Sequence, residues 1–480
     1  MHDRAPYPPV HGSRVSAVMA DIRARIASRK LAPGARLPSV RELAGATGVS
    51  KSTVVDAYER LVAEGSITPR RGSGFYVTGA TRPLSLQGVH PDLDRAIDPL
   101  WMTRQSLTCG PQVLKPGWGL LPHSYMPDPS IQRALREVAR DAGGSGRLNY
   151  ATPLGFAPLR ELIALHLGER GIVADPDGIV LADSANHAVD LVLRLLIEPG
   201  DTVLVDDPCY FNFLALLLSH RAVVVGVPYG RDGVDTDALE RALAAHRPRL
   251  YLTTAGPQNP TGVTPSAAAM HRVLKLAERF DTVVVEDDAF ADFEHEPSSR
   301  LVGLDGFDRV IAVGCYSKTV SAAVRCGYLA ARRDWIEPLL DLKLSTSHGN
   351  THLASVLLHR VLTGGSYKRH LHGLRAKLAR DMGSTLRRLA DCGLTPLVEP
   401  RAGLFVWAEL PGGLDAAAVA RLALVDDVLL APGNVFSASH AFAGHMRFNV
   451  ANCADPRIFA VLERAMAAAR LTSAASIAPP

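Results

Sequence analysis

The sequence predicts a multi-domain protein, in which a small helical domain is followed by a larger α/β domain with a smaller C-terminal α+β subdomain. Two patterns indicate this architecture. Within residues 1–78, apolar residues recur at helical spacing. After Asp128, short apolar runs alternate with helix-length segments, which is typical of a mostly parallel, buried sheet with helices on both faces.

The net charge of +4 is divided unevenly along the chain. Residues 1–80 hold twelve Lys and Arg against six Asp and Glu, whereas the remainder holds 40 against 42. A basic excess in the first domain is the charge pattern expected of a module that binds nucleic acid.

The rest of the composition is that of an ordinary globular protein, with 47% hydrophobic and 21% charged residues. The six cysteines have neither a CxxC pair nor metal-ligand spacing, so we expect reduced thiols and no metal site. No apolar run approaches about 18 residues, and the polar N-terminus lacks the apolar core of a signal peptide. The sequence therefore predicts a cytoplasmic protein with no membrane partner.

Three helices and a basic hairpin are expected in residues 1–78. A first helix spans residues 15–26, and Ser39 with Glu42 forms a capping box for the second. Gly48 ends that helix and Ser50 caps a third, so the pair has the form of a helix-turn-helix unit. The segment SITPRRGSGFYVTG then indicates two short strands around a basic tip, a wing suited to phosphates or the minor groove.

The segment RLPSVRELAGATGVSKSTVVDAYERLVAEGSITPRRGSGFYV resembles the winged helix-turn-helix of GntR-family bacterial repressors nearly end to end. The resemblance implies that this domain binds double-stranded operator DNA. The residues that it places on DNA lie in the two helices and the wing: Arg41, Lys51, Ser52, Thr53, Arg70, Arg71 and Gly72. A small helical domain with solvated arginines is the alternative.

Residues 79–122 are rich in Pro, Gly and polar residues and are predicted to form a linker with a short helix near residues 97–105. Residues 123–472 form the larger domain, and residues 473–480 are expected to be a disordered tail. Predicted strands of the sheet lie at residues 179–181, 202–205, 222–227, 250–253, 282–285 and 309–313. A long charged helix and hairpin-like strands after about Ser366 indicate the smaller subdomain.

The stretch AVGCYSKTVSAAVRCGYL, residues 312–329, contains the most informative side chain, Lys318. It follows a buried strand, where partial desolvation favours the neutral amine, and a neutral amine can attack an aldehyde. Ser317 and Arg325 supply a hydroxyl and a guanidinium of the kind that hold a phosphate. Taken alone, however, the stretch favours the simpler interpretation, a solvated surface lysine after a strand.

Further polar segments fall at predicted strand ends or loops. Ser184, Ala185 and Asn186 lie at a helix N-terminus, which suits a phosphate. Tyr210 is on a loop where its ring could stack on a flat cofactor, and Asp287 ends a buried strand. Singly, Tyr210 could be a core residue, Asn259 in GPQNPTG a turn residue and Asp287 a helix cap.

Together and in this order, the segments around Tyr150, Ser184, Tyr210, Asn259, Asp287, Lys318 and Arg447 resemble the fold type I, aspartate aminotransferase-like enzymes that use pyridoxal 5′-phosphate, over roughly residues 123–472. The resemblance implies that Lys318 forms the aldimine with the cofactor and that Asp287 pairs with its pyridine nitrogen. It implies roles for the other residues as well: Asn259 at the ring 3-oxygen; Tyr210 on the ring face; Ser184, Ala185, Asn186, Ser317 and Arg325 at the phosphate; Tyr150 at the partner subunit's phosphate, in a domain-swapped, head-to-tail homodimer; and Arg447 at an effector's carboxylate.

The sequence departs from the pattern of that family in two respects. Ala289 and Phe290 occupy the places where it usually has a tyrosine that also bonds the 3-oxygen, and Cys315 stands where Ser or Thr is frequent. We expect slower proton transfer, and hence at most weak transaminase activity.

The combination resembles the MocR subfamily of GntR-family transcriptional regulators. It implies a pyridoxal-phosphate-dependent DNA-binding regulator that senses a small amino compound through an external aldimine. Two alternatives stay open: a working aminotransferase with an accessory DNA-binding domain, and a DNA-binding protein whose larger domain has lost the cofactor and only dimerises.

Overall fold

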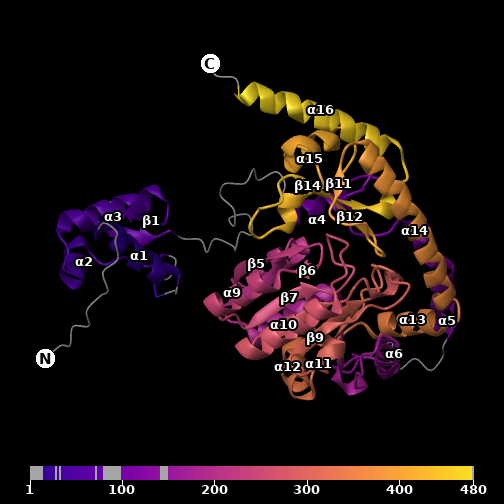
Figure 1. Cartoon of the computed structure of the whole chain (residues 1–480). Helices are drawn as coiled ribbons and strands as arrows, with labels where there is room; N and C mark the ends of the chain where they lie inside the picture. Colours follow the sequence, from indigo (N-terminus) through magenta and orange to yellow (C-terminus); the bar gives the residue numbers. More distant parts are fainter. Residues whose placement is uncertain are drawn as a thin grey trace. The chain divides into compact units, whose positions relative to one another are not determined.

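The computed structural model describes residues 14–27, 30–31, 34–70, 73–78, 99–140 and 150–477. The chain divides into two compact units, residues 1–88 and 89–480. Figure 1 colours the elements from indigo at the N-terminus to yellow at the C-terminus.

The first unit is a helix-turn-helix with a two-stranded wing. Its elements are α1 (Arg14–Ala27), α2 (Val40–Thr47), α3 (Lys51–Ala63), β1 (Ile67–Arg70) and β2 (Gly74–Val77). The predicted capping box is present, because the Ser39 hydroxyl accepts from the Glu42 N–H and the Glu42 carboxylate accepts from the Ser39 N–H. Gly48, at φ 72°, ends α2 in the left-handed region that glycine tolerates. Apolar side chains of all three helices close one small core.

The second unit is built on an eight-stranded sheet, counted over the described residues, in the order β3-β10-β9-β8-β7-β4-β5-β6. Its strands are β3 (Ile179–Ala182), β4 (Thr202–Asp207), β5 (Val223–Gly230), β6 (Gly233–Val234), β7 (Leu250–Thr254), β8 (Val283–Asp287), β9 (Val310–Cys315) and β10 (Gly327–Ala330). The pairs from β9 to β5 are parallel, whereas β10 and β6 run antiparallel to their neighbours. The mostly parallel sheet is therefore confirmed, and β10 is a strand that the sequence analysis did not predict.

Alternation along the strands sends side chains into two separate cores. On β7, Leu250 and Leu252 belong to one core and Tyr251 to the other. The helices that cover the first face are α7 (Ala185–Leu196), α8 (Phe211–Ser219) and α12 (Ile336–Ser347). Those on the second face are α6 (Ala157–Gly168), α9 (Thr236–His246), α10 (Ala267–Phe280) and α11 (Leu301–Asp305). Both faces are thus apolar, which explains why these strands are continuous apolar runs.

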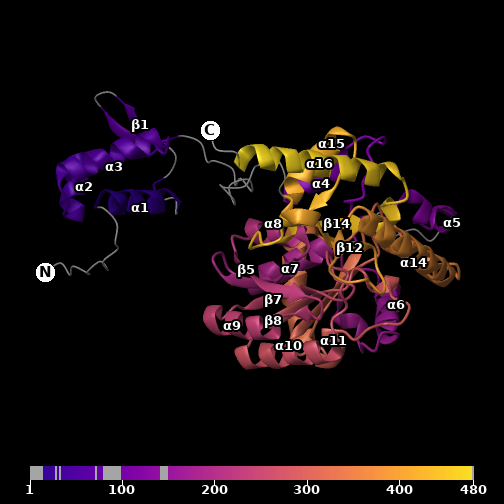
Figure 2. The same cartoon turned by 45° about the horizontal axis from the view of Figure 1, so that its top comes forward.

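The smaller subdomain contains a four-stranded antiparallel sheet in the order β11-β12-β14-β13. Its strands are β11 (Thr395–Pro396), β12 (Phe405–Glu409), β13 (Ala431–Pro432) and β14 (His445–Asn449). Helices α15 (Ala416–Val425) and α16 (Arg457–Ile477) lie together on its side away from the large sheet (Figure 1, Figure 2). The long α14 (Tyr367–Asp391) connects it with α5 (Asp128–Arg140) and α13 (His352–Thr363). Residues 473–477, expected in a disordered tail, continue α16, and residues 478–480 lie outside the described residues.

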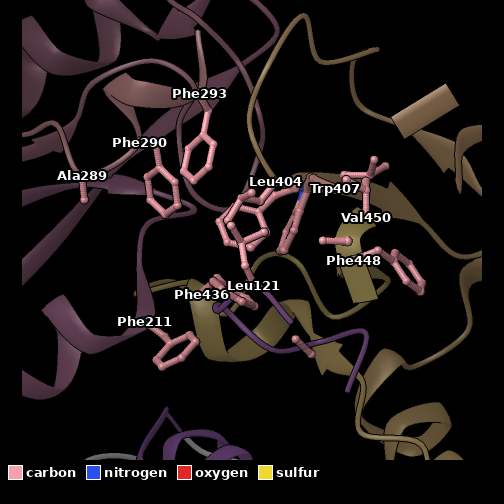
Figure 3. Packing of buried hydrophobic residues seen from close by; sticks show 14 of the residues in the cluster. Leu121, Phe211, Ala289, Phe290, Phe293, Leu404, Trp407, Phe436, Phe448 and Val450 are labelled. Carbon is pink, nitrogen blue, oxygen red and sulfur yellow. The ribbon is translucent and has the colours of Figure 1, made fainter. Parts of the chain in front are cut away.

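Residues 99–122 differ from the expectation of a linker, because they pack on the second unit. Helix α4 (Pro99–Thr108) buries Met102, and Leu114 exchanges backbone hydrogen bonds with the segment that leads into β13. Leu121 joins the core where the large sheet and the smaller subdomain meet, beside Leu404 and Trp407 (Figure 3). Of the predicted linker, residues 79–98 lie outside the described residues.

Within the described ranges, no helix has the combined length and apolarity that crossing a membrane requires.

Candidate functional site

One cavity of about 320 Å³ brings together ten of the residues singled out in the larger domain. They come from loops at the carboxyl ends of β4, β7, β8 and β9, from the start of α7 and from β14. Because parallel strands end at one edge of a sheet, residues far apart in sequence meet there. The ten are Ser184, Ala185, Asn186, Tyr210, Asn259, Asp287, Ser317, Lys318, Arg325 and Arg447.

Lys318 lies three residues beyond the end of β9 and points into this cavity. Its Nζ donates to the carbonyl of Gly119 at 2.9 Å and lies 5.9 Å from the centroid of the Phe290 ring. The side chain is half-buried where it opens onto the cavity, but the surrounding protein desolvates the amine and lowers the pKa of Lys318. At a given pH, a larger fraction of this amine is therefore neutral and nucleophilic than in an exposed lysine.

Asp287 is the last residue of β8 and is buried. Burial raises the pKa of its carboxyl to about 7, although the Ala289 N–H, which donates to Oδ1 at 3.1 Å, opposes the shift. A carboxylate in this position gains most from a cation that enters the cavity, since a charge pair offsets the desolvation of both groups.

An anion-binding corner lies at the start of α7. Ser184 caps the helix by accepting from the His187 N–H at 3.1 Å, and the next N–H groups, of Ala185 and Asn186, lie in its first turn. Ser317 and Arg325 line the same cavity, and Arg325 adopts the left-handed conformation with φ 52°. A helix N-terminus combined with a guanidinium favours a phosphate group.

Arg447 on β14 is only 1% exposed. Its Nη1 donates to Oδ1 of Asn259 at 2.8 Å and its Nη2 to the carbonyl of Gly117 at 2.7 Å, whereas Nε has no hydrogen-bond partner among the described residues. Its guanidinium carbon lies 4.3 Å from the Phe405 ring centroid and 4.7 Å from that of Phe436. Burial lowers the pKa of Arg447. A buried guanidinium with an unpaired N–H group is suited to bind a carboxylate through two hydrogen bonds.

Residues 117–120, which we call the strap, bind these side chains, although no local sequence pattern marks this segment as part of a site. Its four consecutive carbonyls all accept from side chains: Gly117 from Arg447, Trp118 from Asn449, Gly119 from Lys318, and Leu120 from Asn449 and Asn452, at 2.7–2.9 Å. Thr103, Ser106 and Leu107 of α4 also line the cavity. Their Gly- and Pro-rich surroundings predict a linker, and no local pattern marked them as part of a site.

Tyr150 is the predicted cofactor-site residue that this cavity does not include. It is 84% exposed, and its ring lies tilted beside that of His348, with the ring centroids 5.6 Å apart. Ala289 and Phe290, which stand in the place of the usual tyrosine, both line the cavity. Figure 3 labels both among the buried hydrophobic residues of this region. Burial raises the pKa of Tyr210 to about 12, so its phenol stays neutral.

The predicted DNA-contacting residues lie on the surface of the first unit. Arg41, Lys51 and Ser52 are exposed in the first turns of α2 and α3, and Thr53 is half-buried with its hydroxyl 2.8 Å from that of Ser50. Arg70 is exposed at the end of β1, with its guanidinium 4.4 Å from the Tyr76 ring centroid. Arg71 and Gly72 lie outside the described residues.

Arg36 is a further exposed cation beside the wing, which the sequence analysis did not assign. It pairs with Tyr76 through an isolated β-bridge. Arg36 is the first residue of the segment that resembles the GntR family, and this position could have identified it as a candidate DNA-contacting residue.

Two family models match the chain. Residues 123–464 match aminotransferase class I and II, and residues 14–77 match the gntR family of bacterial regulatory proteins. The uncharacterised HTH-type transcriptional regulator YdcR of Escherichia coli is 29% identical over 90% of this chain and 93% of its own length. The probable rhizopine catabolism regulatory protein MocR of Rhizobium meliloti is 28% identical over 74% of this chain and 72% of its own.

Among solved structures, the α-aminoadipate aminotransferase LysN of Thermus thermophilus, complexed with N-(5′-phosphopyridoxyl)-L-leucine, has 26% sequence identity and a TM-score of 0.71. The similarity covers 77% of this chain and 95% of LysN.

The donor set of the cavity fits pyridoxal phosphate. It offers one desolvated amine, one buried carboxylate without a cationic partner among the described side chains, and a phosphate corner at a helix N-terminus. No group of described side chains is arranged to hold a metal ion. The chain therefore belongs to the aminotransferase class I and II family, with pyridoxal phosphate as cofactor, and carries a GntR-type DNA-binding domain in the manner of the MocR subfamily of bacterial transcriptional regulators.

Proposed function

We propose that this chain is a cytoplasmic regulator whose affinity for operator DNA changes when a small amino compound binds beside pyridoxal phosphate. The observation that supports this best is the convergence of Lys318, Asp287, the phosphate corner and Arg447 on one cavity, in a chain whose other unit exposes Arg41 and Lys51.

When bound, pyridoxal phosphate supplies an aldehyde that reacts with primary amines. Lys318 provides the amine that holds it, and Asp287 pairs with the ring nitrogen. Ser317, Arg325 and the start of α7 bind the phosphate, and Asn259 and Tyr210 orient the ring. Each assignment rests on a side chain that lines the cavity.

Arg447 is the residue that binds the effector's carboxylate. At present its Nη2 donates to a strap carbonyl, and its Nε has no partner among the described residues. A carboxylate satisfies a guanidinium better than a carbonyl does, because the hydrogen bonds are charge-assisted. Effector binding therefore replaces the Gly117 contact with an ionic one and shifts the strap, which follows α4 along the chain.

The regulator acts as a head-to-tail homodimer. Tyr150 supports this, since an exposed aromatic residue outside its own cavity is free to reach the partner's phosphate. Two DNA-binding units per dimer match the two half-sites of an operator.

A working aminotransferase is the second candidate, favoured by the ten predicted cofactor and carboxylate-binding residues that line the cavity. Against it, Phe290 provides no hydroxyl near the ring, so we expect at most weak turnover. Conversion of an amino acid and a 2-oxoacid at ordinary enzymatic rates would favour this candidate.

The test combines operator binding with a substitution in the cavity. Full-length, cofactor-loaded protein is titrated with operator DNA with and without amino compounds, and Arg447→Met is compared with wild type. We expect the variant to keep the cofactor but to lose at least 100-fold in sensitivity to carboxylate-bearing effectors, since two charge-assisted hydrogen bonds contribute about 3 kcal/mol. Arg464→Met, which removes an exposed arginine on α16, is the control. An undiminished response in Arg447→Met contradicts the proposal.

A further inference from the structure

We propose that Asp292 is a positioning residue for Lys318, and that it joins the loop carrying this lysine to the start of α14. The inference rests on the proposed function, because it concerns how the same lysine is presented to the cofactor. Asp292 lies in the short 3₁₀ helix η5 (Ala291–Phe293), five residues after Asp287, and is not among the residues that line the cavity. Its influence on the lysine therefore passes through other side chains.

The carboxylate of Asp292 binds three side chains from separate parts of the chain. Its Oδ2 accepts from the hydroxyl of Tyr367, the first residue of α14, at 2.7 Å and from the hydroxyl of Thr319 at 3.1 Å. Those two hydroxyl oxygens lie 2.9 Å apart. Its Oδ1 accepts from Nη2 of Arg170, just after α6. Because Thr319 and Tyr367 are buried, water does not replace the carboxylate as their acceptor, so the contacts hold all four side chains in one arrangement.

The backbone next to the lysine is attached to α14 as well. Thr319 directly follows Lys318, and its carbonyl accepts from Nε2 of His370 at 3.1 Å. The carbonyl of Asp292 accepts from Nε of Arg375 at 2.8 Å. His370 and Arg375 both lie in the first three turns of α14. The amine therefore projects from a loop whose next residue is held to this helix by both its side chain and its backbone.

Helix α14 leads from this cluster to the smaller subdomain (Figure 1). It has 25 residues and is about 38 Å long, and β11 begins four residues after its end. Near that end, Nη1 of Arg388 donates to the Ala454 carbonyl at 3.3 Å. The smaller subdomain also carries Arg447 on β14. Helix α14 thus connects Lys318 with the part of the chain to which we assign the effector's carboxylate.

The test separates covalent capture of the cofactor from its non-covalent binding, on the full-length protein freed of cofactor. In capture, the Lys318 nitrogen bonds to the aldehyde carbon of pyridoxal 5′-phosphate and one molecule of water leaves. Borohydride added at set times traps this bond, and the labelled peptide gives the rate. Pyridoxamine 5′-phosphate has no aldehyde, so calorimetry with it measures the affinity from the phosphate and ring contacts alone.

Thr319→Val keeps the size of the side chain and removes its hydroxyl. We expect it to slow capture roughly tenfold, since a small displacement of a reacting atom is enough for such a loss, and to leave the affinity for pyridoxamine 5′-phosphate unchanged. Asp292→Asn should slow capture at least as much, because an NH₂ group then faces either Arg170 or the two hydroxyls. Thr319→Ser keeps the hydroxyl and should restore capture to near the wild-type rate.

Tyr125→Phe is the matched control, because it removes another buried hydroxyl that donates to an aspartate, here to Oδ2 of Asp381 on α14 at 2.6 Å. Capture by Thr319→Val within twofold of wild type overturns the inference and leaves the proposed function standing. An equal loss of pyridoxamine 5′-phosphate affinity, or an equally slow capture in Tyr125→Phe, also overturns it, since either indicates a general structural effect. If borohydride traps no bond at Lys318 in the wild-type protein, the proposed function fails too.

Discussion

The two functional regions of the molecule differ most in their exposure to water. Arg41, Lys51 and Arg70 of the first unit stand in solvent, whereas Asp287 and Arg447 of the cavity are buried. Exposed cations act nearly independently, since water screens each from the next. Buried groups shift one another's pKa values and share hydrogen-bond partners, so replacing one affects several. The DNA-binding face should therefore tolerate single substitutions that the cavity does not.

The largest effect is expected at Lys318. Lys318→Ala should abolish covalent retention of the cofactor, measured as visible absorbance that survives dialysis and as the labelled peptide after borohydride reduction. Lys343→Met is a matched control. Like Lys318, Lys343 has a pKa lowered by desolvation, here to about 8, but it is fully buried and its Nζ donates to the Pro153 carbonyl outside the cavity. Retention lost equally in both variants would mean that general unfolding, rather than the position of the amine, explains the loss.

A smaller effect is expected in the pH dependence of stability of the cofactor-free protein. The pKa of Asp287 rises from 3.8 to about 7 on folding, so between these values the folded state binds a proton that the unfolded state has released. Stability should then fall as the pH rises through this window, and Asp287→Asn should reduce the slope. Asp206, whose pKa burial raises to about 6, contributes a slope of the same sign that survives the substitution. Unfolding curves from pH 4 to 8 that keep the full slope in Asp287→Asn would place the titration elsewhere.

On the exposed side, Lys51→Ala should weaken operator binding moderately and lower the slope of log affinity against log salt by about 1, since one phosphate contact is lost. Arg60→Ala on the same helix is the control, because Arg60 is paired with Asp56 at 2.9 Å. Titrations at several salt concentrations make the measurement. A salt slope that is the same in Lys51→Ala and wild type would indicate that this lysine does not contact a phosphate.

The smallest effect is expected at the capping box of α2. Ser39→Ala should destabilise the first unit by about 1 kcal/mol while leaving cofactor binding unchanged. Hydrogen exchange in the full chain measures this, as faster exchange at α2 amides. Ser345→Ala, on α12 of the second unit, should leave those amides unaffected. A change in the cofactor absorbance of Ser39→Ala would mean that the two regions are more strongly coupled than their separate cores suggest.

The sequence predicted what short-range patterns determine. The capping box at Ser39 depends on residues three apart, and the helix N-terminus predicted at residues 184–186 is the observed start of α7, with Ser184 as its cap. Likewise, the side chains of Asn259 and Asp287 follow strands whose ends must meet at one sheet edge. Strand β10 was not predicted, because its sequence, Gly-Tyr-Leu-Ala, begins with a glycine directly after a loop of site residues and lacks β-branched residues.

Residues 99–122 show what local patterns do not determine. Their Pro and Gly content predicts a linker, yet four strap carbonyls are held by Lys318, Arg447, Asn449 and Asn452, all at least 190 residues distant. Such contacts depend on tertiary structure alone. The position of Tyr150 outside the cavity of its own chain is likewise invisible to local sequence patterns.

The hydrogen bonds of the strap have a practical consequence for dissecting the protein. A fragment cut at residue 123, where the match to the aminotransferase family begins, would keep the donors of Lys318, Arg447 and Asn449 and remove their acceptors. Its α4 wall and the Leu121 side chain would be missing as well. An isolated sensory fragment, or a chimera with a foreign DNA-binding head, should therefore be joined ahead of Pro99.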